Sequence, residues 1–450
     1  MFVVALSILP CLVMFLYQRP LLLLYLWPIS ILLSTIFVES AFGVAGVTQR
    51  SIWLLPMDPA YFLTILYLGL YASLHPKPFV SLLKEHSFLS VFIALVTLYI
   101  LIYAPIYGKR TIGEARKFYF MFLFPVLALV VVRTPQDLRR FIRVVIFSAT
   151  LAALYTLALG AMRGTVLRVV DSDTALIVTS AAFAMLIHRI HKVVVFHSMV
   201  DRLLLFLFAG LTMGSGHRSV WLAAGLGLLL LLLLHSGRRV LIGKIVVVGL
   251  ASVIVLGTFF IYFPEVGARL GQKFLGILNP SSDDTASWRI EGWDYQLEQL
   301  KSSGRLLFGQ GLGNYYWWEV EGTNVGFTPH NGYVQLVLKF GLFGLVIYGL
   351  LVFEFFRRVV VSRKVVSLEP MKTYLDMGMV NFGAGHGYML GYGMVPDMLV
   401  FFAVAVCAIE LSKKFDKVLF ESPVLAGRLR RIGWQADMRA QRAPIPRYER

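Results

Sequence analysis

Apolar segments that carry few charges recur along the chain at close to the length of a membrane-spanning helix. A hydrocarbon core of roughly 30 Å is crossed by about 20 helical residues. Ile245–Phe263 is the clearest segment, because no charged residue lies between Lys244 and Pro264. The other segments that fit are residues 1–17, 20–38, 59–74, 87–108, 118–132, 144–162, 174–187, 203–216, 219–234, 333–353, 372–391 and 396–411. The pattern predicts an all-α fold, a polytopic transmembrane bundle of about 12 or 13 helices.

Two of these segments give weak signals. Residues 203–216 are short, and residues 372–391 contain Asp376, Asn381 and His386 together with several glycines. The predicted number of helices depends on them, and with it the side of the membrane on which the N-terminus lies. Thirteen crossings would place it outside and twelve inside.

Composition agrees with the membrane interpretation and excludes most soluble classes. The chain has 450 residues, of which 58% are hydrophobic and only 15% charged, whereas soluble domains carry roughly a quarter charged residues. The net charge of +17 fits the enrichment of Lys and Arg in cytoplasmic loops, and no nucleic-acid-binding motif accompanies it. Cys11 and Cys407 both lie in apolar segments far apart in sequence, which argues against a disulfide framework, a metal cluster or a cysteine nucleophile.

Basic residues cluster at alternate ends of the segments and predict a topology. The clusters are Arg133, Arg139, Arg140 and Arg143; His188, Arg189 and Lys192; Arg238, Arg239 and Lys244; and Arg357, Arg358, Arg363 and Lys364. One alternating assignment makes all of them cytoplasmic. Residues 264–331 then face outward, with eight acidic and five basic residues. Long loops in compact folds tend to be functional, so this loop is the first place to seek chemistry.

These observations divide the chain into five parts. Residues 1–202 are predicted to be N-terminal transmembrane helices, and 203–263 transmembrane helices that lead to the site. Residues 264–331 form one long periplasmic loop with short amphipathic helices, the clearest helical periodicity lying at Asp294–Lys301. Residues 332–411 are the C-terminal transmembrane helices. Residues 412–450 are a basic cytoplasmic tail suited to anionic lipid.

Three outward-facing residues are candidates for chemistry. Arg218, with His217 beside it, lies near membrane depth, where a charge suggests a function; the alternative is an arginine that reaches the outer headgroups. Arg289 could bind a phosphate group bidentately, although an ion pair with a neighbouring acid explains it equally simply. His330 follows Pro329 close to a helix start and has the pKa range of a general base near neutral pH; a solvated loop histidine is the plain alternative.

Two other motifs do not support cofactor binding. Asp283 and Asp284 form an acidic pair without His or Cys at metal-ligand spacing. The sequence of residues 309–314 is Gly-Gln-Gly-Leu-Gly-Asn, which lacks the following Lys-Ser/Thr and the cytosolic location of a nucleotide loop. We therefore expect neither a metal nor a cofactor.

One motif consists of His330, Asn331, Gly341 and Gly344, with nine residues between Asn331 and Gly341 and two between the glycines. Two further motifs are Gly-His-Arg-Ser-Val-Trp-Leu at 216–222 and Trp-Arg-Ile-Glu at 288–291. In these motifs residues 203–360 resemble the O-antigen ligase and Wzy-type polysaccharide polymerase superfamily. Its ligase pattern is His, then Asn, Ser or Gln, nine residues, Gly, two residues, then Gly, Thr or Tyr.

The resemblance implies a metal-independent glycosyltransferase at the periplasmic face of the bacterial inner membrane. Its donor would be a glycan on undecaprenyl diphosphate, its acceptor a sugar hydroxyl of lipid A core or of a growing polysaccharide, and its surroundings the membrane lipids. Arg218 and Arg289 would bind the diphosphate, and His330 would activate the acceptor hydroxyl. The residues expected to bind substrate are Asn331, His217, Trp288, Tyr315 and Trp317.

Other functions stay open from the sequence. A polymerase that joins repeat units belongs to the same superfamily, as does a protein-glycosylating relative. A transporter or flippase of lipid-linked sugars would place polar residues near mid-membrane, and Asp376 and His386 keep that reading open. A purely structural membrane subunit fits the motifs least well.

Overall fold

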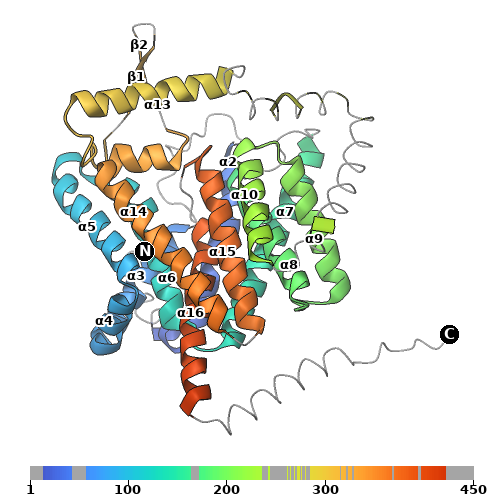
Figure 1. Cartoon of the computed structure of the whole chain (residues 1–450). Coiled ribbons are helices and arrows are strands. Elements are labelled where there is room, and N and C mark those ends of the chain that lie inside the picture. The colour runs from blue at the N-terminus through green and yellow to red at the C-terminus, as the bar shows by residue number, and fades with distance from the viewer. Residues whose placement is uncertain are drawn as a thin grey trace, which may run out of the picture.

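The helical bundle predicted from the apolar pattern is confirmed by a computed structural model (Figure 1). It describes residues 14–42, 57–163, 172–235, 284–314, 316–320, 323–326, 329–366, 369–393 and 397–421, with a few isolated positions between 242 and 279. The helices are α2 (Pro20–Phe42), α3 (Met57–Leu74), α4 (Pro76–Glu85), α5 (Ser87–Tyr107), α6 (Lys109–Val131), α7 (Pro135–Arg163), α8 (Ser172–Ile190), α9 (Ser198–Gly214), α10 (Arg218–Leu234), α13 (Asp284–Ser302), α14 (Gly332–Val365), α15 (Glu369–Met389) and α16 (Asp397–Glu421). The predicted segment 245–263 lies outside the described residues.

Several helices have the length and composition of membrane spans. Within the described part of the chain, three are long and apolar enough to cross a bilayer: Ser87–Tyr107, Pro135–Ala158 and Gly332–Val365. Shorter apolar helices are Pro20–Leu33, Pro59–Leu74, Phe122–Val131, Thr174–Ile190 and Arg218–Leu234. The chain is therefore a multi-pass membrane protein.

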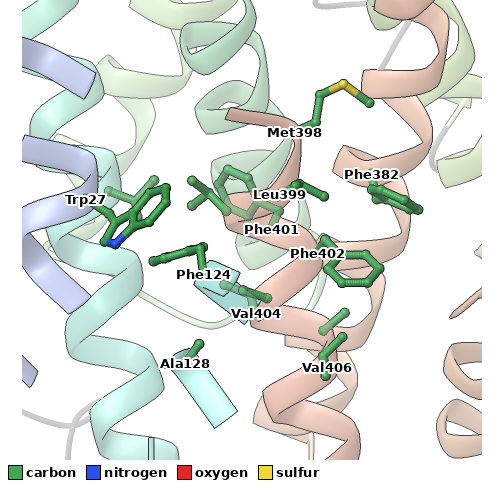
Figure 2. Packing of buried hydrophobic residues seen from close by; sticks show 14 of the residues in the cluster. Trp27, Phe124, Ala128, Phe382, Met398, Leu399, Phe401, Phe402, Val404 and Val406 are labelled. Carbon is green, nitrogen blue, oxygen red and sulfur yellow. The ribbon is translucent and has the colours of Figure 1, made fainter. Parts of the chain in front are cut away.

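Helices from both ends of the chain share one core (Figure 2). Trp27 of α2 lies 4.6 Å from Phe124 of α6 between ring centroids, and α6 in turn packs against α16. Phe402 of α16 lies 4.8 Å from Phe382 of α15. Aromatic pairs at these separations add stability beyond the area they bury.

The segment with the weakest sequence signal, residues 372–391, forms the central helix α15. Its residues are mostly buried, and it packs against α10 and α16. Its glycines explain both observations, because a Cβ at Gly378 would lie 2.7 Å from the Phe401 carbonyl oxygen and one at Gly387 2.7 Å from the Leu222 carbonyl oxygen. Small residues let helix backbones approach closely in membranes, so the glycines that lowered the predicted helical character are what permit the packing.

The loop of residues 264–331 contains more order than predicted. Helix α13 lies across one end of the bundle, and a hairpin of β1 (Trp317–Val320) and β2 (Thr323–Gly326) projects beyond it (Figure 1). The strands are antiparallel, with Trp317 opposite Gly326. The prediction of short helices alone was incomplete, since aromatic and β-branched residues favour strands. The Gln296 amide of α13 donates to the Trp317 carbonyl and ties the hairpin to the helix.

Candidate active site

His330 lies directly before α14, as the sequence predicted for a residue near a helix start. Asn331 is the N-cap, and its Oδ1 accepts from the backbone amides of Tyr333 at 2.9 Å and Val334 at 3.1 Å. Such caps satisfy amides that have no partner within the helix. The Asn331 Nδ2 also donates to the Leu390 carbonyl at 3.0 Å. This side chain therefore fixes the start of α14 against the turn that follows α15.

The turn that follows α15, residues 390–393, forms one wall of the site. The ring of Tyr392 lies 5.4 Å from the ring of His330 between centroids, and Tyr388 lies 5.2 Å from Tyr392. This turn was not among the elements predicted from the sequence. Its available signal was the cluster of glycines around Gly391, which are common where backbones approach one another closely.

Arg289 of α13 reaches the same turn and acts on His330 electrostatically. Its Nη1 donates to the Gly391 carbonyl at 3.5 Å. Burial of the imidazole, and secondly the positive charge of Arg289, hold the pKa of His330 below its ordinary value of 6.5. Both effects disfavour the charged imidazolium. The structure thus brings together two of the residues predicted to be catalytic, in an environment that favours the neutral imidazole over the imidazolium.

Arg218 begins α10, whose first turn adjoins the 390–393 turn. Its neighbour Ser219 is buried, and the Ser219 Cβ lies 3.2 Å from where a Cβ would stand at Gly391. Gly216, two residues before Arg218, has φ +64, a conformation that glycine adopts readily in tight turns. The two arginines therefore lie on elements that meet at one turn. His217 is the half-buried residue at the N-cap position of α10.

Lys273 is a further cation beside this region that sequence reasoning did not single out. Its Nζ donates to the Gly216 carbonyl at 3.1 Å. It lies in the long loop among unremarkable neighbours, so no local pattern marks it. The hydrogen bond to Gly216 holds the positively charged Lys273 ammonium group next to the turn that carries His217 and Arg218.

The aromatic residues predicted to bind sugar lie around α13 and the hairpin. Trp288 packs on Trp318 with ring centroids 4.9 Å apart, and Trp317 is 52% exposed. Tyr315 lies outside the described residues, and so does Asp283 of the acidic pair. Across the ranges that the structure describes, no group of three or more His, Cys, Asp or Glu residues is arranged to hold a metal ion.

A break at Gly341 divides α14 into two parts. The part that follows His330 therefore runs in a different direction from the rest of the helix. Gly341 has φ +68 within the helix, and backbone groups freed by the break bond to the preceding loop. The amides of Leu342 and Phe343 donate to the Leu306 and Leu307 carbonyls, both at 3.0 Å. In a membrane such groups require partners within the protein.

The glycine-rich segment 309–314 resembles a nucleotide loop only superficially. In the structure it lies against this break. The Gln310 amide donates to the Leu338 carbonyl at 2.8 Å. The buried Lys339 Nζ forms an ion pair with Glu114 Oε2 at 2.5 Å and donates to the Asn314 carbonyl at 2.8 Å. This segment is therefore a structural support for the broken helix.

Gly341→Ala is expected to destabilise the protein. A Cβ there would lie 2.1 Å from the Leu307 carbonyl oxygen at a φ that L residues rarely adopt, and such strain costs about 1–3 kcal/mol. The melting temperature of the purified protein in detergent should fall. Gly349→Ala in the same helix is the matched control: nothing lies within 4 Å of its Cβ position, so it should leave the melting temperature unchanged or raise it. Equal behaviour of the two variants would contradict the role given to the break.

The structure is that of a multi-pass membrane protein in which His330 and Arg289, which belongs to the loop helix α13, meet at the 390–393 turn. Residues 203–349, about a third of the chain, match the family model Wzy_C, described as O-Antigen ligase. The match includes Arg218, Arg289 and His330 and ends before the 390–393 turn. No curated protein matches the chain.

Proposed function

We propose that the protein transfers a glycan from undecaprenyl diphosphate to an acceptor sugar hydroxyl, in the manner of an O-antigen ligase. The observation that carries the proposal is the meeting of His330 with Arg289 at the 390–393 turn, within a domain of that family. A neutral imidazole beside a permanent cation supplies a base for the hydroxyl and a partner for phosphate oxygens. The alternative in the same superfamily is a polymerase of O-antigen or exopolysaccharide.

The reaction divides between these residues. The acceptor oxygen attacks the anomeric carbon, and its proton passes to an unprotonated ring nitrogen of His330. The bond between that carbon and the diphosphate breaks, and the electron pair leaves on the diphosphate. Arg289 and Arg218 stabilise the negative charge that develops on the diphosphate. We propose that no metal ion takes part in this stabilisation. Asn331 holds His330 in place through the Leu390 carbonyl, while His217, Trp288, Tyr315 and Trp317 contact the substrates.

We place the site at the periplasmic face of the bacterial inner membrane. The long loop that carries Arg289 has eight acidic and five basic residues, whereas the basic clusters lie at the other ends of the segments. That contrast is the one expected across a bacterial membrane. The donor and acceptor would then reach the site laterally from the outer leaflet.

The test is glycan transfer by the purified protein in detergent, with lipid-diphosphate-linked oligosaccharide as donor. One arm contains the donor alone and another adds lipid A core. A product that appears only with lipid A core supports the ligase, and a ladder from donor alone supports the polymerase. A rate that a metal chelator abolishes would contradict the metal-independent chemistry.

The pH dependence of kcat/KM follows from the environment of His330. The neutral imidazole is the active form, and its pKa is held below 6.5 by burial and by Arg289. Activity should therefore persist as the pH falls to 6.5, where more than half should remain, and should be lost only below that value. A midpoint at or above pH 6.5 would contradict the assignment of His330 as the base.

The polar residues that suggested a transporter have structural partners in the bundle. Asp376 forms an ion pair with Arg363 at 2.5 Å and bonds to His191 at 3.0 Å. His386 Nε2 bonds to the Tyr348 hydroxyl at 3.2 Å. These contacts favour a role for Asp376 and His386 in helix packing. A transporter would be favoured only if the experiments show no transfer of the glycan.

A further inference from the structure

A cavity of about 830 Å³ lies where α8 ends and α9 begins. Its volume falls within the range of small-molecule sites. Helix α9 runs from this cavity to the turn before Arg218, so the cavity and the candidate active site lie at opposite ends of the same helix (Figure 1). A ligand in this cavity would therefore occupy the opposite side of the membrane from the chemistry.

The cavity is positively charged. Arg189, Lys192 and Arg202 line it, and none of them forms an ion pair with a carboxylate in the described part of the chain. The lining also contains Asp201, but both of its oxygens are engaged: Oδ2 accepts from the Val195 amide at 3.0 Å and Oδ1 from the Phe196 amide at 3.1 Å. Arg202 also donates from Nε to the Ser198 carbonyl at 3.2 Å and from Nη2 to the Ser198 hydroxyl at 3.5 Å, and its remaining N–H groups, with Arg189 and Lys192, can bind an anion.

The rest of the lining is apolar and continues onto the outer surface of α9. Leu186, Leu205 and Phe206 face the cavity. Phe206 is 56% exposed, and Leu203 and Met199 on the same helix are 59% and 61% exposed. Exposed apolar residues beside basic ones form an amphiphilic surface, which suits a ligand with an anionic group and a hydrocarbon chain.

We propose that this cavity binds an anionic phospholipid of the cytoplasmic leaflet. Its phosphodiester lies among Arg189, Lys192 and Arg202, and an acyl chain follows Leu205 and Phe206 along α9. A zwitterionic lipid brings its own cation into a cavity that already carries positive charge, and so binds less well. The position fits the topology, because basic residues near the ends of spans face the leaflet that carries anionic lipid. The proposal does not depend on the glycosyltransferase function.

The test measures the melting temperature of the full-length protein in neutral detergent as lipid is added. A ligand that binds only the folded state raises this temperature in a saturable manner. Phosphatidylglycerol should do so, whereas phosphatidylcholine with the same acyl chains, and inorganic phosphate, should not. Arg189→Gln and Lys192→Gln should each weaken the apparent affinity about fivefold, the effect expected for one basic residue at an anionic surface.

Lys84→Gln is the matched control, because it removes the same charge from α4, which packs against α3 and α5 and not beside the cavity. It should bind phosphatidylglycerol as the wild type does. All three variants should melt at the wild-type temperature without lipid, since Arg189, Lys192 and Lys84 are exposed residues. Equal shifts with phosphatidylcholine, or unchanged affinity in the Arg189 and Lys192 variants, would overturn the proposal. An equal shift with inorganic phosphate would identify a site for a free anion instead.

Discussion

His330→Ala is expected to lower kcat for glycan transfer by about 10²–10⁴-fold, the usual contribution of a general base. The variant removes the proposed proton acceptor but leaves the Asn331 cap and the 390–393 turn, which hold the start of α14. Donor binding should therefore change little. Transfer is measured by the appearance of glycosylated acceptor, and donor binding by retention of the lipid-linked oligosaccharide on the purified protein.

His75→Gln is the control for this variant. His75 lies before α4, is exposed and bonds to the Tyr17 hydroxyl at 3.0 Å, so its loss should leave transfer unchanged. A His330→Ala protein that folds and turns over at the wild-type rate would contradict the base assignment. The family assignment of residues 203–349 would stand in that case, and another acceptor of the proton would have to be found.

Arg289→Gln is expected to have the second largest effect, a loss of about 10²–10³-fold in kcat, as for removal of one donor to a developing anion. A guanidinium can donate two parallel hydrogen bonds to a phosphate group, and glutamine supplies neither that geometry nor the charge. Arg289→Lys keeps the charge and should retain an intermediate rate. The readout is kcat, with KM for the donor measured separately.

The same variant separates a chemical role for Arg289 from a structural one. Its positive charge helps to lower the pKa of His330, so its removal should move the acidic limb of the kcat/KM profile to higher pH. A residue that only held the Gly391 carbonyl would reduce the rate without moving the limb. Lys301→Gln removes a charge from the exposed end of the same helix and should move neither quantity. An unmoved limb in Arg289→Gln would contradict the coupling.

The helices could be predicted from the sequence because burial in a bilayer demands long apolar segments. Where the segment is apolar throughout, as in Ser87–Tyr107, the pattern and the structure agree. The pattern predicts α15 only weakly, because its polar residues and glycines contact neighbouring helices that no local window contains. The hairpin was missed for a related reason: its four-residue strands are too short for periodicity to reveal.

The sequence indicates only some of the elements that form the candidate site. The spacing from His330 to Gly344 marks one short stretch of chain, and Arg289 lies in a second matched sequence. The turn that joins them follows a helix outside the matched domain, and Asn331 and Leu390 are 59 positions apart. Contacts at that separation arise from the packing of α10, α14 and α15, which the sequence does not encode in any local motif.

The most direct test of the central claim follows both products of the donor in one reaction. The purified full-length protein is mixed with lipid-diphosphate-linked oligosaccharide and lipid A core, and glycosylated acceptor and free undecaprenyl diphosphate are measured together. The account predicts that the two appear in equal amounts with the wild type and that both fall together in His330→Ala. Donor that remains intact, or moves across a vesicle membrane without cleavage, would contradict the account and favour a transporter.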